Sequence, residues 1–588
     1  MFFFEEIWKL LFKGDNTQMF FLLNGLVFIF IIFVATPSQA IGPAPENFRA
    51  QTSAYIEHEN ELRSQWRTDP DQPRLDYTPQ EDGIEETLVI RVDFSDHPGE
   101  RPASDFEQAF FGEETSLRAY YSQLSRESET RMSVSYPDGE PPIFPADGSW
   151  VRMPENMAYY GQPDPGGRYP DYLSRLKEMT QSALHELITE IDFSQYDHDN
   201  DNTLDHLVIV HSGNDEAESY IANDLWSLRF SATIGYYQNI LINSVIVVAE
   251  NPDSNVPIGT ICHEFFHEFG APDIYDYHLD GESGEPVGAW SLMGNGSFFG
   301  EGQKPAAICG YLQMDFDGNP NNGLRGWIIP TDIDNSATDI EIDRLGDSST
   351  RSLYRIYIPG TDNSEYFLIE NRCARETYMY DRELPGSDGL LIWHIDEGMT
   401  TDSYPYPIGF NDGPGLTPYY RVWLEDSRDP DHTGSYTLDT ASFSLDQNRS
   451  YISRVGDPNT AGNSDSIGMF RIYGVGYSGE IMKFSVDFES EDIPTEKQAT
   501  RNFPNPFRTW TKIEFDLPEP EACTFAVYNI SGQRVHYRNL GTVPEGSYFV
   551  VWNGRHSDGQ QASMGKYFYE LKLGETKEYG PMIWMPEK

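Results

Sequence analysis

Residues 261–273 read ICHEFFHEFGAPD, and this stretch decides how the fold of the surrounding chain is interpreted. Residues four apart share one face of a helix, so His263 and His267 can present ring nitrogens to a single metal ion. Gly270 can adopt the left-handed conformation that ends a helix. The chain then turns back, and Asp273 is the next residue able to supply a third ligand.

Three protein ligands leave the fourth position of a tetrahedral zinc ion to water, which is typical of a catalytic site. Glu264 follows the first ligand directly, so it is badly placed to bind the metal and well placed to act as general base. Zinc lowers the pKa of water and polarises a carbonyl group. The motif therefore predicts hydrolysis of peptide bonds by zinc-activated water.

The alternative is a helix that merely carries two surface histidines. With 13 histidines among 588 residues, a bare HExxH occurs by chance in roughly one such chain in fifty. The added glycine and aspartate make chance much less plausible. Phe265, Phe266 and Phe269 also fill the buried side of the same helix. We therefore interpret the stretch as a zinc site.

The chain is long enough for three or four folded units. Its 94 acidic and 41 basic residues give a formal net charge of −53. A surface this acidic repels phosphate backbones, so we expect no nucleic-acid partner. It suits solubility, binding of calcium or life in salt, and composition does not rank these three. The four cysteines show no CxxC spacing, which argues against a disulfide scaffold or a thiolate zinc cluster.

The N-terminus has the parts of a secretory signal. Lys9 and Lys13 precede an apolar run at 19–35, and the small residues Ser38 and Ala40 follow it. We expect a signal peptide over residues 1–40, cleaved after Ala40. The alternative is an uncleaved anchor, because the run reaches the short end of a membrane-spanning length. Both predict export, with membrane contact only through the signal or by surface attachment.

The next segments indicate an α+β catalytic domain over residues 87–334. Residues 41–86 are rich in Pro, Gln, Asp and Glu and are interpreted as a linker or short pro-segment. Residues 87–94 and 207–210 have the pattern of buried strands. Residues 172–193 carry apolar side chains at three- and four-residue spacing, which predicts an amphipathic helix.

The remainder is predicted to be all-β. Residues 335–490 contain short alternating runs between turn residues, which are typical of a β-sandwich domain. A polar linker is expected at 491–500. Residues 501–588 repeat the alternating pattern with regular turns and predict a small Ig-like sandwich.

Residues 197–205 contain a second candidate metal site. Oxygen-bearing side chains stand at its alternate positions: Asp197, Asp199, Asp201, Thr203 and Asp205. Such side chains converge on one cation in a tight loop, and calcium prefers oxygen ligands. Asn202 replaces the usual glycine but tolerates left-handed geometry, and Val208 stands where an EF-hand has glutamate. The loop predicts structural calcium, with a solvated acidic turn as the alternative.

The zinc stretch, together with WSLMGNG at 290–296, resembles the immune inhibitor A-like family of secreted bacterial metallopeptidases, within the metzincins. The resemblance extends over about residues 87–480 and includes LIENR at 368–372. It implies a metzincin-like zinc protease domain with the motif HExxHxxGxxD. It also implies that Met293 forms the methionine turn beneath the zinc.

The C-terminal block carries NFPNPF at 502–507, VYNISGQ at 527–533 and GKYFY at 565–569. These motifs resemble type nine secretion system sorting domains and flagellar hook-capping-like Ig modules. The resemblance implies export across an outer membrane, with the secretion machinery as a partner of this domain. It also allows attachment to the cell surface.

Three further features are interpreted as structural. The side chain of Cys262 points away from that of His263 on a helix and is expected to be a buried thiol. His394 is expected to be a core histidine with its hydrogen bonds made. The polar residues 370–372 beside a buried strand are expected to contact the catalytic unit.

The sequence thus predicts a secreted zinc endopeptidase that acts on extracellular proteins. The rival hypothesis is a calcium-braced surface adhesion protein with a vestigial protease site. An adhesion protein has no need of His263, Glu264, His267 and Asp273 together, so their joint presence favours the enzyme.

Overall fold

The structure is a computed structural model that describes residue 80 and residues 82–585, apart from several gaps. The longer gaps are 127–130, 162–171, 276–285, 315–326, 398–420, 426–440, 445–469 and 489–500, and short breaks occur elsewhere. The expected signal peptide (1–40) and the linker (491–500) lie outside the described residues. Within the described part, none of the helices combines the length and apolarity needed to cross a membrane.

The first part of the chain is built on a six-stranded sheet, ordered β2-β1-β4-β6-β5, with β3 also paired to β1. All neighbours are parallel except β5, which runs antiparallel to β6 at one edge. The strands are β1 (Ile84–Asp93), β2 (Ser133–Ser135), β3 (Val151–Arg152), β4 (His206–His211), β5 (Leu228–Tyr237) and β6 (Ile240–Ala249). β1 starts before the expected residue 87, because Ile84 to Glu86 pair with β2.

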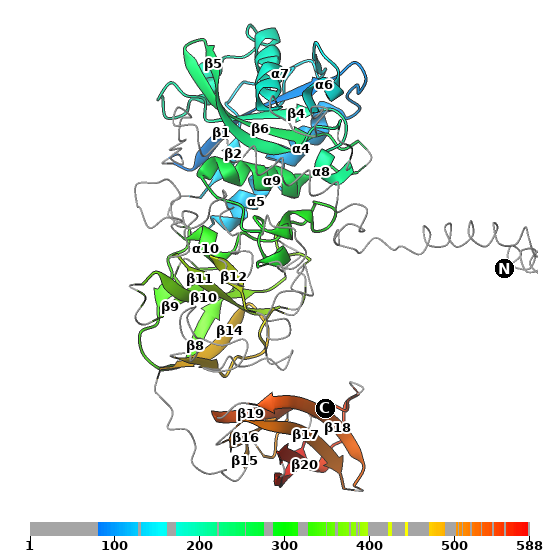
Figure 1. Ribbon diagram of the computed structural model, residues 1–588, viewed down its shortest axis with the longest axis vertical. Coiled ribbons are helices and arrows are strands. Elements are labelled where there is room, and N and C mark those ends of the chain that lie inside the picture. The colour runs from blue at the N-terminus through cyan, green and yellow to red at the C-terminus, as the bar shows by residue number, and fades with distance from the viewer. Residues whose placement is uncertain are drawn as a thin grey trace, which may run out of the picture. The chain divides into compact units, whose positions relative to one another are not determined.

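Helices cover both faces of this sheet (Figure 1). Leu88, Ile90 and Leu207 face one core, which they share with α6 (Met157–Gly161) and α7 (Tyr172–Glu186). The alternate strand residues Val89 and Val208 face a second core. It is shared with α4 (Ala103–Phe111), α5 (Leu117–Leu124) and α9 (Ile258–Phe266). Strands covered on both faces are apolar throughout, which explains the unbroken apolar runs in the sequence.

The helix expected over 172–193 is shorter than its apolar pattern. α7 ends at Glu186, and the chain turns before the 3-10 helix η1 (Phe193–Tyr196). Gln238, in the turn between β5 and β6, donates to the carbonyls of Ile188 at 3.1 Å and Ile191 at 2.8 Å. This distant side chain satisfies carbonyl groups that a continuing helix would have used.

Shorter elements connect the sheet to the rest of the chain. They are α8 (Glu216–Ser219), η2 (His267–Phe269), η3 (Gly288–Trp290), η4 (Asn295–Phe298) and α10 (Gly310–Gln313). η2 continues α9 directly, and η3 and η4 flank the residues around Met293.

Two further sheets form a β-sandwich with a common core. The five-stranded sheet has the order β12-β11-β10-β9-β7, and the three-stranded sheet has the order β13-β14-β8. The strands are β7 (Thr331–Asp332), β8 (Ala337–Asp343), β9 (Leu353–Tyr357), β10 (Glu365–Arg372), β11 (Gly389–Asp396), β12 (Val422–Leu424), β13 (Arg471–Tyr473) and β14 (Ile481–Asp487). Phe367 and Ile369 of β10 face the three-stranded sheet, whereas Tyr366 and Leu368 join the core that contains α9.

The last part of the chain has its own core and two sheets, ordered β15-β16-β19 and β18-β17-β20-β21. The strands are β15 (Arg501–Phe503), β16 (Thr511–Leu517), β17 (Glu521–Asn529), β18 (Arg534–Val543), β19 (Gly546–Trp552), β20 (Gly565–Leu573) and β21 (Thr576–Trp584). Described pairs within both sheets are antiparallel, as in an Ig-like sandwich.

Candidate active site

The helix that carries the HExxH motif is buried on most of its surface. α9 ends at Phe266, and η2 carries the helical path through His267 to Phe269. Gly270 then adopts φ = 80°, the left-handed conformation expected from the sequence. Phe265 and Phe266 are fully buried, so their packing fixes the orientation of the face that bears the histidines.

The turn at Gly270 brings three candidate ligands together. His263 Nε2 lies 2.8 Å from Asp273 Oδ1, and His267 Nε2 lies 3.4 Å from the same oxygen. One ligand atom from each of the three residues lies within 4.8 Å of the other two. Asp273 is 2 % exposed, whereas the two histidine side chains are 12 % and 18 % exposed. The two imidazoles are therefore partly accessible to solvent, whereas the carboxylate of Asp273 is buried.

Backbone carbonyls set the tautomer of both imidazoles. His263 Nδ1 lies 3.0 Å from the carbonyl oxygen of Leu292, and His267 Nδ1 lies 2.7 Å from that of Ala271. A carbonyl oxygen only accepts, so each Nδ1 carries a proton and donates it. Nε2 is then the nitrogen that each ring can offer to a metal ion, because histidine binds metals through a ring nitrogen that has lost its proton.

The carboxylate of Glu264 lies in the electrostatic field of this cluster. Burial raises the pKa of Glu264, and the nearby His263 and His267 oppose the rise. Burial also lowers the pKa of His263, but the hydrogen bond and the charge of Asp273 outweigh it and bring that pKa to about 9. The donor set is thus two imidazole nitrogens and one buried carboxylate oxygen, which suits zinc.

A buried charge network that the local sequence pattern did not predict lies behind α9 and η2. Glu268 Oε1 accepts from Arg229 Nε at 2.8 Å and from Ser244 Oγ at 2.5 Å. Its other oxygen lies 3.4 Å from His206 Nδ1, and His206 Nε2 lies 3.1 Å from Glu85. Burial raises the pKa of Glu268, but the positive charges of Arg229 and His206 reverse this and lower it to about 2. The sequence signal for this network is Glu268 itself, a charged residue that stands among phenylalanines directly after HExxH.

The acidic loop at 197–205 is only partly assembled as expected. Carboxylate oxygens of Asp197, Asp199 and Asp205 lie within 4.8 Å of one another. Asp201 is not in this group, and its Oδ1 accepts from the backbone nitrogen of Thr203 at 2.6 Å. Burial raises the pKa of Asp205 to about 8, with the charge of Glu85 adding to the rise and that of His206 opposing it.

The residues interpreted as structural have structural partners. Cys262 is a buried free thiol. His394 lies between carboxylates, with Nε2 2.9 Å from Glu365 and Nδ1 3.4 Å from Glu425. Glu370 accepts from the backbone nitrogen of Gly310 at 2.6 Å and so contacts the catalytic unit, as expected. Met293 is fully buried, and its carbonyl accepts from the nitrogen of Ile274 at 3.0 Å.

Two helical histidines four residues apart, a nearby aspartate and a buried glutamate on the same helix are the residue types of a metallopeptidase site. Residues 85–323 match the family described as immune inhibitor A peptidase M6, catalytic domain. The chain therefore carries a peptidase M6 catalytic domain of the immune inhibitor A family. Residues 508–577 match the FlgD Ig-like domain, so the protein is multidomain, with an Ig-like domain following the protease domain.

Curated relatives support this assignment over part of the chain. A pre-pro-metalloprotease PrtV from Vibrio cholerae is 29% identical over 34% of this chain and 23% of its own length. An immune inhibitor A from Bacillus thuringiensis is 24% identical over 37% of each chain. This chain thus spans well under half the length of these relatives. Among solved structures, OgpA from Akkermansia muciniphila covers 89% of this chain and 98% of its own at 10% identity, with a TM-score of only 0.25.

Proposed function

We propose that this chain is a secreted zinc endopeptidase in which His263, His267 and Asp273 hold the metal and Glu264 is the general base. The observation that carries the proposal is the convergence of the three ligand atoms within 4.8 Å, with Glu264 on the same helix. The substrates are extracellular proteins or peptides.

The chain's own residues prepare the site for a cation. The two neutral imidazoles and one carboxylate leave a zinc site with a net charge of +1. When bound, zinc lowers the pKa of water and polarises the carbonyl under attack. The backbone carbonyls of Leu292 and Ala271 hold both imidazole rings in orientation, so the ligand set is formed before a substrate arrives.

Glu264 moves protons at this site. Its carboxylate takes a proton from the attacking water and delivers it to the departing amine. The residue is 8 % exposed, and this low exposure places the carboxylate in a poorly hydrated environment, where it competes well for a proton. We further propose that Met293 forms a metzincin-type methionine turn. Its complete burial beside the ligand loop supports that assignment.

We propose that the loop at 197–205 holds a structural calcium ion. The three grouped carboxylates of Asp197, Asp199 and Asp205 support it, as does the left-handed φ of 68° at Asn202. Calcium should raise the melting temperature, and Asp205→Asn should abolish the rise, because a ligand that binds only the folded state stabilises that state. Asp201→Asn is the matched control. Because the carboxylate of Asp201 lies outside the group, this variant should keep the rise in melting temperature with calcium. An equal response of wild type and Asp205→Asn to calcium would contradict the site.

We propose that the protein acts outside the cell and that its C-terminal Ig-like domain engages the secretion machinery. The expected signal at 1–40 and the FlgD-like domain at 508–577 support this proposal. Fractionation of cells that produce the full chain, compared with a chain ending at residue 490, tests it. Export of both forms to the medium in equal amounts would contradict a role of the domain in secretion.

Zinc content and proteolysis together test the enzymatic proposal. The purified full chain should contain one zinc per molecule and digest casein, and a chelator should abolish the digestion. Glu264→Gln should keep the zinc and lose at least about 100-fold in rate. Glu186→Gln, the same change on the exposed end of α7, is the matched control and should be fully active.

These measurements also distinguish the enzyme from the rival hypothesis, an adhesion protein with a vestigial protease site. Equal digestion by wild type and Glu264→Gln would show that the assigned mechanism is wrong. A wild-type protein that binds zinc but cleaves neither casein nor a mixed peptide library would favour an adhesion protein with a vestigial site.

A further inference from the structure

Arg372, at the end of β10 in the sandwich, is fully buried against the catalytic unit. Its Nη1 donates to the backbone carbonyl of Trp290 at 2.7 Å. Its Nε donates to Asp381 Oδ2 at 2.7 Å, and its Nη2 donates to the other oxygen of Asp381. Glu370, two residues earlier on the same face of the strand, lies 3.1 Å from Nη1. The guanidinium therefore has a fixed orientation.

Asp381 extends this contact to a second segment of the catalytic unit. Its Oδ1 accepts from the backbone nitrogen of Ala307 at 2.9 Å. The carbonyl of Ala307 in turn accepts from the nitrogen of Leu292 at 3.3 Å. The Arg372–Asp381 pair thus contacts the methionine-turn segment at Trp290 and the segment that pairs with it at Ala307.

The held segment contacts one candidate zinc ligand directly and the residue next to another. The carbonyl of Leu292 accepts from His263 Nδ1 at 3.0 Å. The carbonyl of Met293, the next residue, accepts from the nitrogen of Ile274, which directly follows Asp273. A shift of this segment would therefore turn the imidazole of His263 and displace the loop that carries Asp273.

We propose that Arg372 is a positioning residue for the zinc site. It holds the Trp290–Met293 segment so that the carbonyl of Leu292 orients His263. This inference rests on the proposed zinc site, because it concerns how firmly the metal is held. It assigns a function in the active site to a side chain of the β-sandwich, outside residues 85–323 that match the peptidase family.

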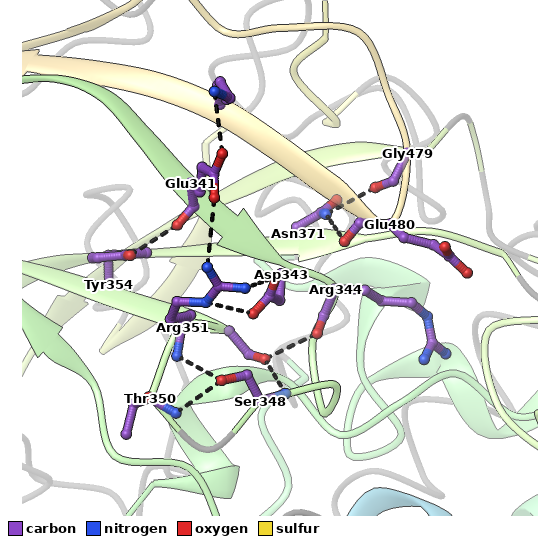
Figure 2. Close-up of polar contacts among 12 residues, drawn as sticks. Glu341, Asp343, Arg344, Ser348, Thr350, Arg351, Tyr354, Asn371, Gly479 and Glu480 are labelled. Carbon is purple, nitrogen blue, oxygen red and sulfur yellow. Dashed lines mark hydrogen bonds and ion pairs between the residues drawn. The ribbon is translucent and has the colours of Figure 1, made fainter.

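The neighbouring residue provides a matched control. Side chains alternate along a strand, so Asn371 points to the opposite face from Arg372. Its Nδ2 donates to the carbonyls of Gly479 at 2.9 Å and Glu480 at 3.2 Å, as Figure 2 shows. Asn371 is also fully buried, but these contacts remain within the sandwich. Removal of the Asn371 side chain should therefore lower the stability of the sandwich without disturbing the zinc ligands.

The experiment measures zinc release from the full chain into a chromogenic chelator, beside the thermal unfolding of each variant. Arg372→Lys keeps a charge for Asp381 but cannot make the same forked contact with Asp381 and Trp290. Asp381→Asn loosens the same contact without introducing a larger side chain. Loss of a direct partner of a metal ligand weakens metal binding about 10–100-fold, and Arg372 acts on such a partner, the Leu292 carbonyl, at one remove. Both variants should therefore bind zinc about 10-fold more weakly, at the lower end of that range. Asn371→Ala should unfold at a lower temperature and hold zinc as wild type does.

A spectroscopic reading separates positioning from general destabilisation. In protein loaded with cobalt in place of zinc, the visible spectrum should change in Arg372→Lys and stay the same in Asn371→Ala. Wild-type zinc affinity in folded Arg372→Lys and Asp381→Asn would overturn the inference. So would an equal loss of affinity in Asn371→Ala. A wild-type protein without zinc would instead contradict the proposed function.

Discussion

The guanidinium of Arg229, on the edge strand β5, lies 2.8 Å from the carboxylate of Glu268, which directly follows His267. Glu268 is 2 % exposed and also lies beside His206. This contact joins η2, which continues α9, to the edge strand β5 of the sheet. The helix is therefore held from behind by a buried charge pair as well as by apolar packing.

Glu268→Ala should destabilise the catalytic unit by about 3–5 kcal/mol. The change leaves the positive groups of Arg229 and His206 without their buried partner, and removing one member of a buried pair costs about that much. Denaturant unfolding followed by tryptophan fluorescence measures it. Glu268→Gln keeps an acceptor for Arg229 and should lose less. Equal stability of Glu268→Ala and wild type would show that the network contributes nothing.

Gly259→Ala should destabilise α9 and its surroundings more than Gly270→Ala. A Cβ at Gly259 would lie 1.9 Å from the backbone oxygen of Ser297, so α9 would have to move, at about 1–3 kcal/mol. A Cβ at Gly270 meets no atom within 4 Å, and the cost there is the left-handed φ alone, about 1–2 kcal/mol. Melting temperatures check the order, with Gly270→Asn as control, because Asn tolerates this φ. The reverse order would contradict the packing at Ser297.

Asp273→Asn should keep the fold and weaken zinc binding by more than about 100-fold. The amide has the shape of the carboxylate but lacks its charge, and the loss of a ligand should exceed the 10–100-fold typical of outer partners. Competition with a chelator of known affinity measures the change. Circular dichroism should match that of the wild-type protein. Unchanged affinity would remove Asp273 from the ligand set and leave the two histidines in place.

The β-sandwich should lose stability as pH rises, through His394. Burial lowers the pKa of His394, but hydrogen bonds to Glu365 and Glu425 outweigh it, so the pKa is raised. The stabilisation is then complete below the unfolded pKa of about 6.5 and is lost as pH rises through the folded pKa. Trp423 and Phe367 pack on the imidazole and carry no charge.

Unfolding free energies measured across this pH range check the prediction. The slope from this one group is at most about 1.4 kcal/mol per pH unit. His394→Gln should remove that slope and leave the remaining pH dependence unchanged. A variant with the wild-type slope would assign the effect to another group.

Local patterns were enough to predict that His263, His267 and Asp273 come together. The spacing of His263 and His267 and the glycine at 270 are properties of neighbouring residues, and the structure shows the expected left-handed turn. Strands such as β1 and β4 were visible as apolar runs because both of their faces are covered. The end of α7 could not be found in this way, since Gln238 satisfies carbonyls near it from a hairpin that follows much later in the chain.

Contacts between segments that are distant in the chain could not be predicted from the sequence either. Arg372 could be recognised from the sequence as a charged residue beside a buried strand. The residues near it in the chain do not indicate that Trp290 is its partner. The same holds for Glu268, whose partners Arg229 and His206 lie on two different strands. Charged residues at buried positions signal that a partner exists. Only the packed fold identifies which one.

The core shared by α9 and β10 determines how far the protease can be shortened. The match to the peptidase family ends at residue 323, yet Leu368, Leu391 and Trp393 belong to the same core as Phe265. A fragment that stops at 323 would expose this apolar surface to water and should aggregate. The smallest soluble protease fragment should therefore extend to about residue 488, where the strands of the sandwich are complete.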